Sequence, residues 1–292
     1  MKKILITGAN SYIGTSFEAY VSQWPDAYQV DTVDMIGESW REKSFAGYDS
    51  VFHVAGIAHS DTGRVSEERR AMYYDVNANL AIETAMKAKK DGARQFIFMS
   101  SAIVYGNSAP LGKRKLITRD TPVAPANFYG DTKVQAERGI LPLSDDSFKV
   151  VIVRPPMVYG PGSRGNYPIL SKLARVLPVF PAVDNQRSML FVDNLMEFIR
   201  LMVHNEEQGI FWPQNREYTN TTDMVRLIAQ AHGKKIMVTE CFNWALKLIR
   251  PFTGLVDKAF GSLAYEPEMS RYSEDYCKVG LKESIDKAEG IQ

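Results

Sequence analysis

A tyrosine and a lysine four residues apart, Tyr129 and Lys133 in the segment YGDTK, are the side chains of this sequence best suited to proton transfer. On a helix this spacing places both side chains on one face, one turn apart. A free phenol has a pKa of about 10 and is a poor base at neutral pH, but a neighbouring ammonium group favours the phenolate. The pair therefore predicts general acid/base chemistry at Tyr129, and a solvent-exposed surface pair is the competing interpretation.

Two serines, Ser100 and Ser101, end the segment RQFIFMSS, whose apolar run is typical of a buried strand. Ligands of open α/β folds bind outside the carboxyl ends of the strands. A Ser101 hydroxyl at that edge can hydrogen-bond a substrate oxygen and help Tyr129 to move its proton. The alternative is a strand-end serine that satisfies only its own backbone.

The stretch TGANSYIG, residues 7–14, follows the apolar run ILI and opens a helical pattern. Gly8 suits a sharp turn and Gly14 suits close helix packing, whereas Ser11 stands where a dinucleotide-binding loop has its middle glycine. Unpaired N–H groups at such a helix start stabilise a phosphate, and the Ser11 hydroxyl can donate a further hydrogen bond. We therefore expect a dinucleotide to bind at this loop.

A carboxylate at the end of the second predicted strand indicates which dinucleotide binds. Asp34 lies twenty residues after Gly14. It can accept hydrogen bonds from the adenosine ribose hydroxyls and would repel a 2′-phosphate, which favours NAD over NADP. Asp31 is the nearby competitor, but Asp34 lies closer to the carboxyl end of the strand.

These groups require a scaffold, and the chain supplies alternating strand and helix patterns. The strand-like segments are KKILIT, YQVDTVD, DSVFHVAG, RQFIFMSS and KVVIVRPPMVYG, and helical patterns include residues 66–90 and NFYGDTKVQAERGI. This alternation predicts an α/β fold, a Rossmann-type doubly wound parallel sheet. After Gly160 the regular alternation of strand and helix patterns ends. We expect an NAD-binding domain over residues 1–160, rejoined by 183–204, and a smaller, discontinuous C-terminal substrate lobe over 161–182 and 205–292.

Composition narrows the possible partners and setting. The chain has 292 residues, 45% hydrophobic, with a net charge of +1, which gives no electrostatic reason to expect nucleic acid. No apolar run approaches the ~18 residues of a membrane span, so membrane insertion is not expected. Two separated cysteines favour a reduced, cytoplasmic setting. His53 and His59 lack ligand-spaced partners, so no metal is expected.

One apolar stretch, residues 241–265, carries scattered lysine and arginine. A membrane-surface helix is one interpretation. Packing of a second-lobe helix on the core is favoured, because Pro251 and Gly254 interrupt the run.

An ordered set of motifs resembles a known family over roughly the first 200 residues. The motifs are TGANSYIG, Asp34, VFHVAG, YYDVNAN, FMSSAIVYG, YGDTK, VRPPMVYGPG and QRSMLFVDNL. Together they resemble the extended short-chain dehydrogenase/reductases, in the nucleotide-sugar epimerase/dehydratase branch typified by UDP-galactose 4-epimerase. Ser101-Ala102-Ile103 stands where 4,6-dehydratases carry Thr-Asp-Glu, which argues against a dehydratase.

The resemblance implies roles for individual residues. Ser101 and Tyr129 would handle the proton of a sugar hydroxyl, and Lys133 would tune Tyr129 and hold the nicotinamide ribose. Contacts with NAD are implied for Gly8, Ser11, Tyr12, Ile13, Gly14, Asp34, Ala55, Gly56, Asn79, Ser100, Tyr129, Lys133 and Pro156. Substrate contacts are implied for Ser101, Tyr129, Asn166 and Arg187, the last two at the nucleotide diphosphate. The competing interpretation of Arg187 is a surface loop charge.

The leading functional hypothesis is an NAD-dependent UDP-hexose 4-epimerase that oxidises C4 transiently. An NAD(P)-dependent reductase of a UDP-4-keto-6-deoxy sugar, which would use the same residues once, is the alternative. A non-catalytic dinucleotide-binding regulator is the hypothesis from another class, and it predicts a broken catalytic set. In relatives, the helices around residues 72–86 and Val134 form a four-helix interface, so the resemblance implies a homodimer, and ordinary core packing of these helices is the alternative interpretation.

Overall fold

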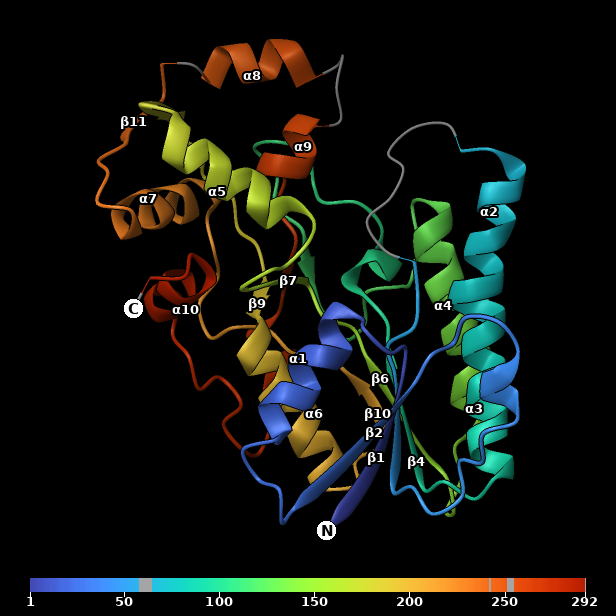
Figure 1. Ribbon diagram of the computed structural model, residues 1–292. Helices are drawn as coiled ribbons and strands as arrows, with labels where there is room; N and C mark the ends of the chain where they lie inside the picture. The colour runs from blue at the N-terminus through green and yellow to red at the C-terminus, as the bar shows by residue number, and fades with distance from the viewer. Residues whose placement is uncertain (58–64, 242, 251–254, 292) are drawn as a thin grey trace. The chain divides into compact units, whose positions relative to one another are not determined.

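The computed structural model describes residues 1–57, 65–241, 243–250 and 255–291 (Figure 1). Its contacts divide the chain into two units. Unit 1 comprises residues 1–106, 122–155 and 195–213, and unit 2 comprises 107–121, 156–194 and 214–292. The division is more interleaved than the sequence predicts. Residues 107–121 belong to unit 2, and the segment that rejoins unit 1 is 195–213 rather than 183–204.

Unit 1 is built on a six-stranded parallel sheet, which confirms the predicted fold class. In sequence order the strands are β1 (Lys2–Thr7), β2 (Tyr28–Val33), β3 (Ser50–His53), β4 (Gln95–Met99), β6 (Lys149–Val153) and β10 (Gly209–Phe211). Their order across the sheet is β10-β6-β4-β3-β1-β2, and every pairing is parallel. The chain therefore changes direction across the sheet between β1 and β3, where doubly wound folds bind their ligands.

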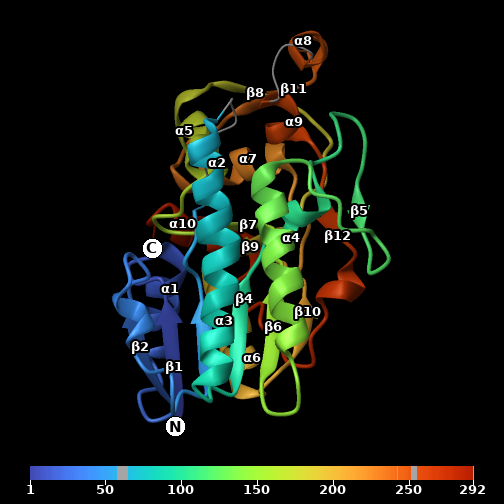
Figure 2. The ribbon, with the colours of Figure 1, turned by 90° about the vertical axis from the view of Figure 1, so that its right-hand side faces the viewer.

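Helices cover both faces of this sheet, as Figures 1 and 2 show. One face carries α1 (Tyr12–Val21) and, from Leu195 onward, α6 (Val192–His204). The other face carries α2 (Glu67–Tyr74), a π-helical turn (Asp75–Asn79), α3 (Leu80–Lys90) and α4 (Phe128–Ile140). The Ser66 hydroxyl caps α2 by accepting a hydrogen bond from Arg69 N at 3.2 Å, which supports the helix start that the sequence predicts.

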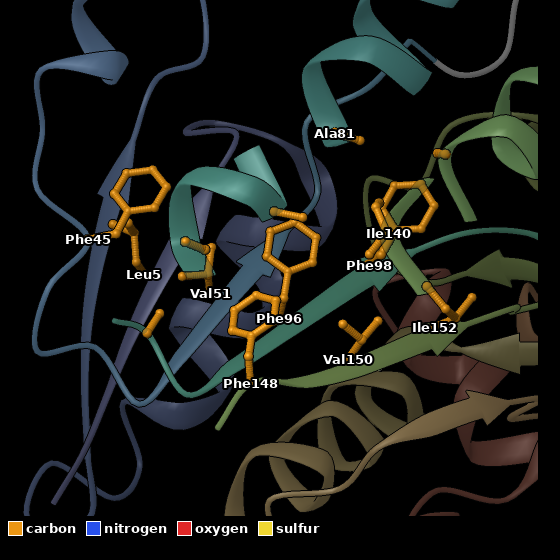
Figure 3. Close-up of a cluster of buried hydrophobic side chains, with 14 of the residues drawn as sticks. Leu5, Phe45, Val51, Ala81, Phe96, Phe98, Ile140, Phe148, Val150 and Ile152 are labelled. Carbon is orange, nitrogen blue, oxygen red and sulfur yellow. The ribbon is translucent and has the colours of Figure 1, made fainter. Parts of the chain in front are cut away.

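The core between the sheet and the second helical face consists of aromatic and branched side chains, mostly from the strands, and of alanines, mostly from the helices (Figure 3). Phe96 and Phe98 alternate with Ile97 along β4, and all three are fully buried. A strand buried on both faces has a continuous apolar run, and this pattern is why RQFIFMSS predicts a buried strand. Short 3-10 turns join the main elements: η1 (Ser39–Arg41), η3 (Ala102–Tyr105) and η4 (Leu141–Leu143).

Unit 2 consists of short strand pairs and helices. The pairs are β7 (Met157–Tyr159) with β9 (Met189–Phe191), β8 (Val179–Pro181) with β11 (Met237–Thr239), and β5 (Leu116–Ile117) with β12 (Ala264–Tyr265). The helices are α5 (Asn166–Val176), α7 (Thr221–Ala231), α8 (Asn243–Ile249), α9 (Leu255–Phe260) and α10 (Leu281–Ala288), and η6 (Pro267–Ser270) is a 3-10 turn.

A buried polar centre joins distant parts of unit 2. The Tyr159 hydroxyl lies 2.5 Å from the Ser284 hydroxyl and accepts a hydrogen bond from Asn215 Nδ2 at 3.1 Å. Asn194 Nδ2 donates to Asn215 Oδ1 at 3.0 Å and to the carbonyl of Val279 at 2.9 Å. None of the helices in the described part of the chain is long and apolar enough to span a membrane.

Candidate active site

Tyr129 and Lys133 lie one turn apart on α4, as their spacing predicts. Asn127 caps the helix by accepting a hydrogen bond from Gly130 N at 2.8 Å. The Lys133 Nζ donates to the carbonyl of Met99 at 2.9 Å and lies 4.7 Å from the centroid of the Phe98 ring. The buried ammonium group therefore sits at the carboxyl end of β4, and the interpretation as a solvent-exposed surface pair is wrong for Lys133.

The start of α4 packs closely on the turn that carries Ser101. A Cβ atom at Gly130 would lie 2.9 Å from the carbonyl oxygen of Ile103, so this approach requires glycine. Ser101 is partly exposed, and its Oγ accepts a hydrogen bond from Ile103 N at 3.3 Å. Ser101 thus satisfies a backbone N–H group, as the alternative interpretation expects. Its hydroxyl can still donate a hydrogen bond to a ligand.

Burial shifts the pKa values of both members of the pair. Burial, with a smaller contribution from Tyr73, raises the pKa of Tyr129 to about 12. Burial lowers the pKa of Lys133 to about 8, against a raising effect of Glu137. The structure thus differs from the expectation that Lys133 lowers the pKa of Tyr129. The Lys133 ammonium is bonded to a carbonyl, so the chain alone does not favour the phenolate.

The loop between β1 and α1 has the geometry that a dinucleotide requires. Gly8 has φ of +115°, and a Cβ atom there would lie 2.7 Å from Ala55 N. A Cβ atom at Gly14 would lie 2.7 Å from Ser11 Oγ, which itself accepts a hydrogen bond from Gly14 N at 3.1 Å. Ser11 is therefore the N-cap of α1, and its hydroxyl accepts this bond and remains able to donate one to a ligand. The cradle fits a pyrophosphate at the helix start.

The two candidate carboxylates, Asp31 within β2 and Asp34 just after it, accept different hydrogen bonds. The Asp31 carboxylate accepts a hydrogen bond from the Tyr48 hydroxyl at 2.7 Å. Asp34 is exposed, and its Oδ1 accepts from Ile36 N at 3.0 Å. One oxygen of Asp34 thus remains for the ribose hydroxyls, which supports Asp34 over Asp31.

Further predicted cofactor positions line the same end of the sheet. Tyr12 and Ile13 form the first turn of α1 and are half-buried. Ala55 follows β3 and donates its N–H to the carbonyl of Thr7 at 2.9 Å. A Cβ atom at Gly56 would lie 3.8 Å from Lys133 Nζ. The structure therefore brings the strand-end glycine beside the lysine that would hold the nicotinamide ribose.

The predicted role of Asn79 is not supported. Asn79 is exposed and donates to Asp75 Oδ1 at 2.9 Å. The buried asparagine of this π-helical turn is Asn77, whose side chain accepts from Ile57 N at 2.7 Å and donates to Ile57 O at 3.0 Å. Asn77 thus holds the segment that follows β3, and a Cβ atom at Gly56 would lie 3.1 Å from Asn77 Oδ1.

Ser100 also differs from its predicted role. Ser100 is buried, and its hydroxyl donates to Glu137 Oε1 at 2.5 Å, so it is not available to NAD. Arg154 holds Glu137 through two hydrogen bonds, Nε to Oε1 at 3.0 Å and Nη2 to Oε2 at 2.6 Å. Sequence reasoning missed this buried pair, although Glu137 is four residues after Lys133 and so shares its helix face.

The predicted residues of unit 2 are placed as follows. Pro156 is buried in the bend between β6 and β7. Asn166 is the first residue of α5 and is half-buried. Arg187 Nη1 donates to the carbonyls of Lys258 at 2.8 Å and Ala259 at 3.1 Å. Arg187 is half-buried, burial lowers its pKa, and none of the described carboxylates forms an ion pair with it.

The described residues contain no cluster of three or more side chains that could hold a metal ion. His53 is buried, its Nδ1 lies 2.8 Å from the Thr7 hydroxyl, and burial together with the charge of Lys133 lowers its pKa to about 3. His59 lies outside the described residues.

Comparison with known proteins agrees with this geometry. Residues 4–243 match the model of the NAD dependent epimerase/dehydratase family. UDP-glucose 4-epimerase of Vibrio cholerae is 28% identical over 90% of this chain and 86% of its own length. N-acetyl-alpha-D-glucosaminyl-diphospho-ditrans,octacis-undecaprenol 4-epimerase of Escherichia coli O157:H7 is 27% identical over 80% of this chain and 73% of its own length.

A solved structure supports the fold. The dTDP-4-dehydrorhamnose reductase of Clostridium acetobutylicum superposes with a TM-score of 0.73 at 20% identity, covering 98% of each chain. The family match spans most of the chain and includes the glycine loop, Asp34 and the Tyr129–Lys133 pair. The chain is an NAD(P)-dependent sugar-nucleotide enzyme, and it belongs to the NAD-dependent epimerase/dehydratase family.

Proposed function

We propose that this protein is a 4-epimerase of a UDP-hexose that retains NAD. The observation that carries the proposal is the buried Lys133 ammonium, fixed at the carboxyl end of β4 one turn from Tyr129 and beside Gly56. The V. cholerae relative supports the epimerase assignment, since its similarity extends over 90% of this chain.

NAD would be held by the Gly8–Gly14 loop, by Asp34 and by Lys133, and when bound it supplies reversible hydride transfer at C4 of the sugar. Tyr129 takes the proton of the C4 hydroxyl and returns it after the 4-keto sugar has presented its other face. Ser101 donates a hydrogen bond to the C4 oxygen and keeps it within reach of the phenol. The Lys133 ammonium stabilises the negative charge that develops on Tyr129.

Residues of unit 2 would hold the nucleotide diphosphate. The guanidinium of Arg187 has carbonyl partners and no described carboxylate partner, so its positive charge is not neutralised within the described part of the chain. Asn166, at the first turn of α5, adds an amide donor. A guanidinium with fixed orientation suits a diphosphate because it donates two parallel hydrogen bonds.

A reductase of a 4-keto sugar nucleotide is the second candidate. The fold similarity to the C. acetobutylicum reductase covers 98% of both chains, and the apolar sequence Pro155-Pro156-Met157 favours a deoxygenated sugar. In that reaction Tyr129 would deliver one proton to the C4 oxygen and take none back.

Turnover of purified protein without added cofactor separates these candidates. The epimerase proposal predicts interconversion of UDP-glucose with UDP-galactose, or of the N-acetylated pair, by the protein as isolated. In a second assay with added NADH, its stoichiometric consumption with a UDP-4-keto-6-deoxy sugar, and no epimerisation, would replace this proposal with the reductase. A polyprenyl-diphosphate sugar belongs in the same panel, because the E. coli relative is named for such a substrate.

Substitution of Tyr129 tests the assigned base. Tyr129→Phe removes the hydroxyl that moves the proton, so we expect kcat to fall by about 10²- to 10⁴-fold while NAD stays bound. Tyr28→Phe is the matched control, since the Tyr28 hydroxyl bonds Arg200 at the opposite end of β2. Undiminished turnover of Tyr129→Phe would remove this residue from the mechanism.

A further inference from the structure

Helix α8 presents large apolar side chains to solvent. Trp244 is 67% exposed, Leu248 63% and Ile249 49%, and no residue of α8 is buried. Trp244, Lys247 and Leu248 follow the i, i+3, i+4 spacing of one helix face. The expectation that residues 241–265 pack on the core is therefore wrong for α8. It holds for the end of the same stretch, where Val256, Phe260 and Tyr265 are buried.

The exposed side chains of α8 belong to a larger surface of unit 2. Ile169 and Val176 of α5 are 59% and 66% exposed, and Met237 of β11 is 61% exposed. The opposite face of α5, with Tyr167, Ser171 and Ala174, is buried. In both ribbon views α5, β11 and α8 lie at the same end of unit 2 (Figures 1 and 2). We call these six exposed apolar residues, together with the exposed lysines and arginines of the same segments, the apolar–basic face.

The charge of this face is strongly one-sided. Residues 166–180 and 234–250 contain six basic side chains and one acidic side chain, Glu240, whereas the whole chain has a net charge of +1. The exposed cations are Lys172, Arg175, Lys235, Lys247 and Arg250. Arg250 pairs with Asp257 at 3.0 Å, and the other four have no carboxylate partner within the described ranges.

We propose that the apolar–basic face docks this protein on the surface of an anionic lipid bilayer. Tryptophan with leucine and isoleucine inserts at the boundary between headgroups and acyl chains, while lysine stems extend their ammonium groups to the anionic headgroups. Polybasic segments gain affinity for anionic lipid with each added cation. A second copy of the chain fits less well, because pairing two such faces would bring like charges together.

This inference goes beyond the proposed sugar chemistry. The apolar–basic face includes none of Ser101, Tyr129, Lys133 and Arg187. Lipid binding can therefore be present or absent whatever reaction the protein catalyses, and it is measured without substrate.

Sedimentation with vesicles tests the proposal. We expect binding to phosphatidylcholine vesicles that contain phosphatidylglycerol, and little binding to phosphatidylcholine alone. Lys172→Gln and Lys247→Gln should each lower the partition coefficient about fivefold, and Leu248→Glu by more than about tenfold. Lys282→Gln and Leu116→Glu are matched controls, since these exposed residues lie on α10 and on β5, outside the face.

Fluorescence supplies a second readout that does not depend on loss of binding. Insertion of Trp244 should shift the emission to shorter wavelength on anionic vesicles. Trp244→Phe should abolish this shift while sedimentation persists, and Trp24→Phe, at the other exposed tryptophan, should leave it intact.

Three results would overturn the proposal. The first is equal sedimentation with both vesicle types, and the second is equal losses in the face and control variants. The third is self-association, removed by Leu248→Glu, in the absence of any vesicle binding, which would assign the face to a second copy.

Discussion

Lys133 is the residue whose ionisation state decides whether Tyr129 can act. Its pKa is lowered to about 8 by burial, so its charge is lost as the pH rises through that value. Burial raises the pKa of Tyr129, so its phenolate depends on the positive charge of Lys133 one turn away. Activity should therefore fall on the alkaline side once Lys133 becomes neutral.

Glu137 opposes this loss, because its charge raises the pKa of Lys133. Glu137→Gln should therefore move the alkaline limb of the pH–kcat profile to lower pH, since it removes a negative charge and leaves Arg154 unpaired nearby. It should also lower the free energy of unfolding by about 3–5 kcal/mol, the usual cost of breaking a buried ion pair.

Both effects need a control for loss of an acidic group. Glu83→Gln removes a carboxylate that pairs with Arg41 at a more exposed position. That variant should leave the pH limb in place and change stability by less than about 1 kcal/mol. An alkaline limb that stays fixed in Glu137→Gln, with a lowered melting temperature, would restrict Glu137 to a structural role.

Arg187 is expected to act on substrate affinity and not on the chemical step. Arg187→Met should raise KM for the UDP-sugar by about 10- to 100-fold and leave bound NAD unchanged, because a charge-assisted contact to a diphosphate is lost. Arg226→Met, an exposed pair partner of Asp223, is the control. An unchanged KM in steady-state assays would exclude the diphosphate contact.

Individual residues were predictable where spacing alone carries the chemistry. Tyr129, Lys133 and Asp34 are of this kind, because helix period and strand ends set their positions. Ser100 and Asn79 were not, since each has a neighbour of similar character. Ser100 turns to a buried glutamate, and the π-helical turn buries Asn77 instead of Asn79.

At the scale of elements, the loop between β1 and α1 is the most tightly determined feature. Gly8→Ala should weaken NAD binding at least about tenfold, because the new Cβ would meet Ala55 N at 2.7 Å and the φ of +115° disfavours any side chain. Gly92→Ala is the matched control, since Gly92 has φ of +87° and open space around its Cα.

Titration of tryptophan fluorescence with NAD measures this effect in the apoprotein. If both alanine variants bind NAD equally well, the close approach of Gly8 to Ala55 contributes nothing to the cofactor site.

The alternation of strands and helices made five strands of the main sheet predictable. The strand β10 escaped because three residues carry too little periodicity to identify an edge strand. The burial of helix α8 was predicted wrongly for a related reason. An apolar helix pattern does not distinguish a face buried in the protein from one exposed on its surface.

At the scale of the whole molecule, the two units are built from interleaved segments. Residues 107–121 leave unit 1 between η3 and α4, and β5 within them pairs with β12, far along the chain. Sequence patterns report local periodicity, so a long-range pairing of two-residue strands leaves no signal. The family match extends to residue 243 and therefore includes segments of both units.

The most direct test of the proposed epimerase follows a label at the reacting carbon. UDP-glucose and UDP-N-acetylglucosamine, each deuterated at C4, are incubated with the protein as isolated, without added NAD, and the products are examined by mass spectrometry and NMR. We predict the C4 epimer of at least one substrate with deuterium retained at C4. Absence of both epimers, or loss of deuterium from C4 to solvent, would contradict it.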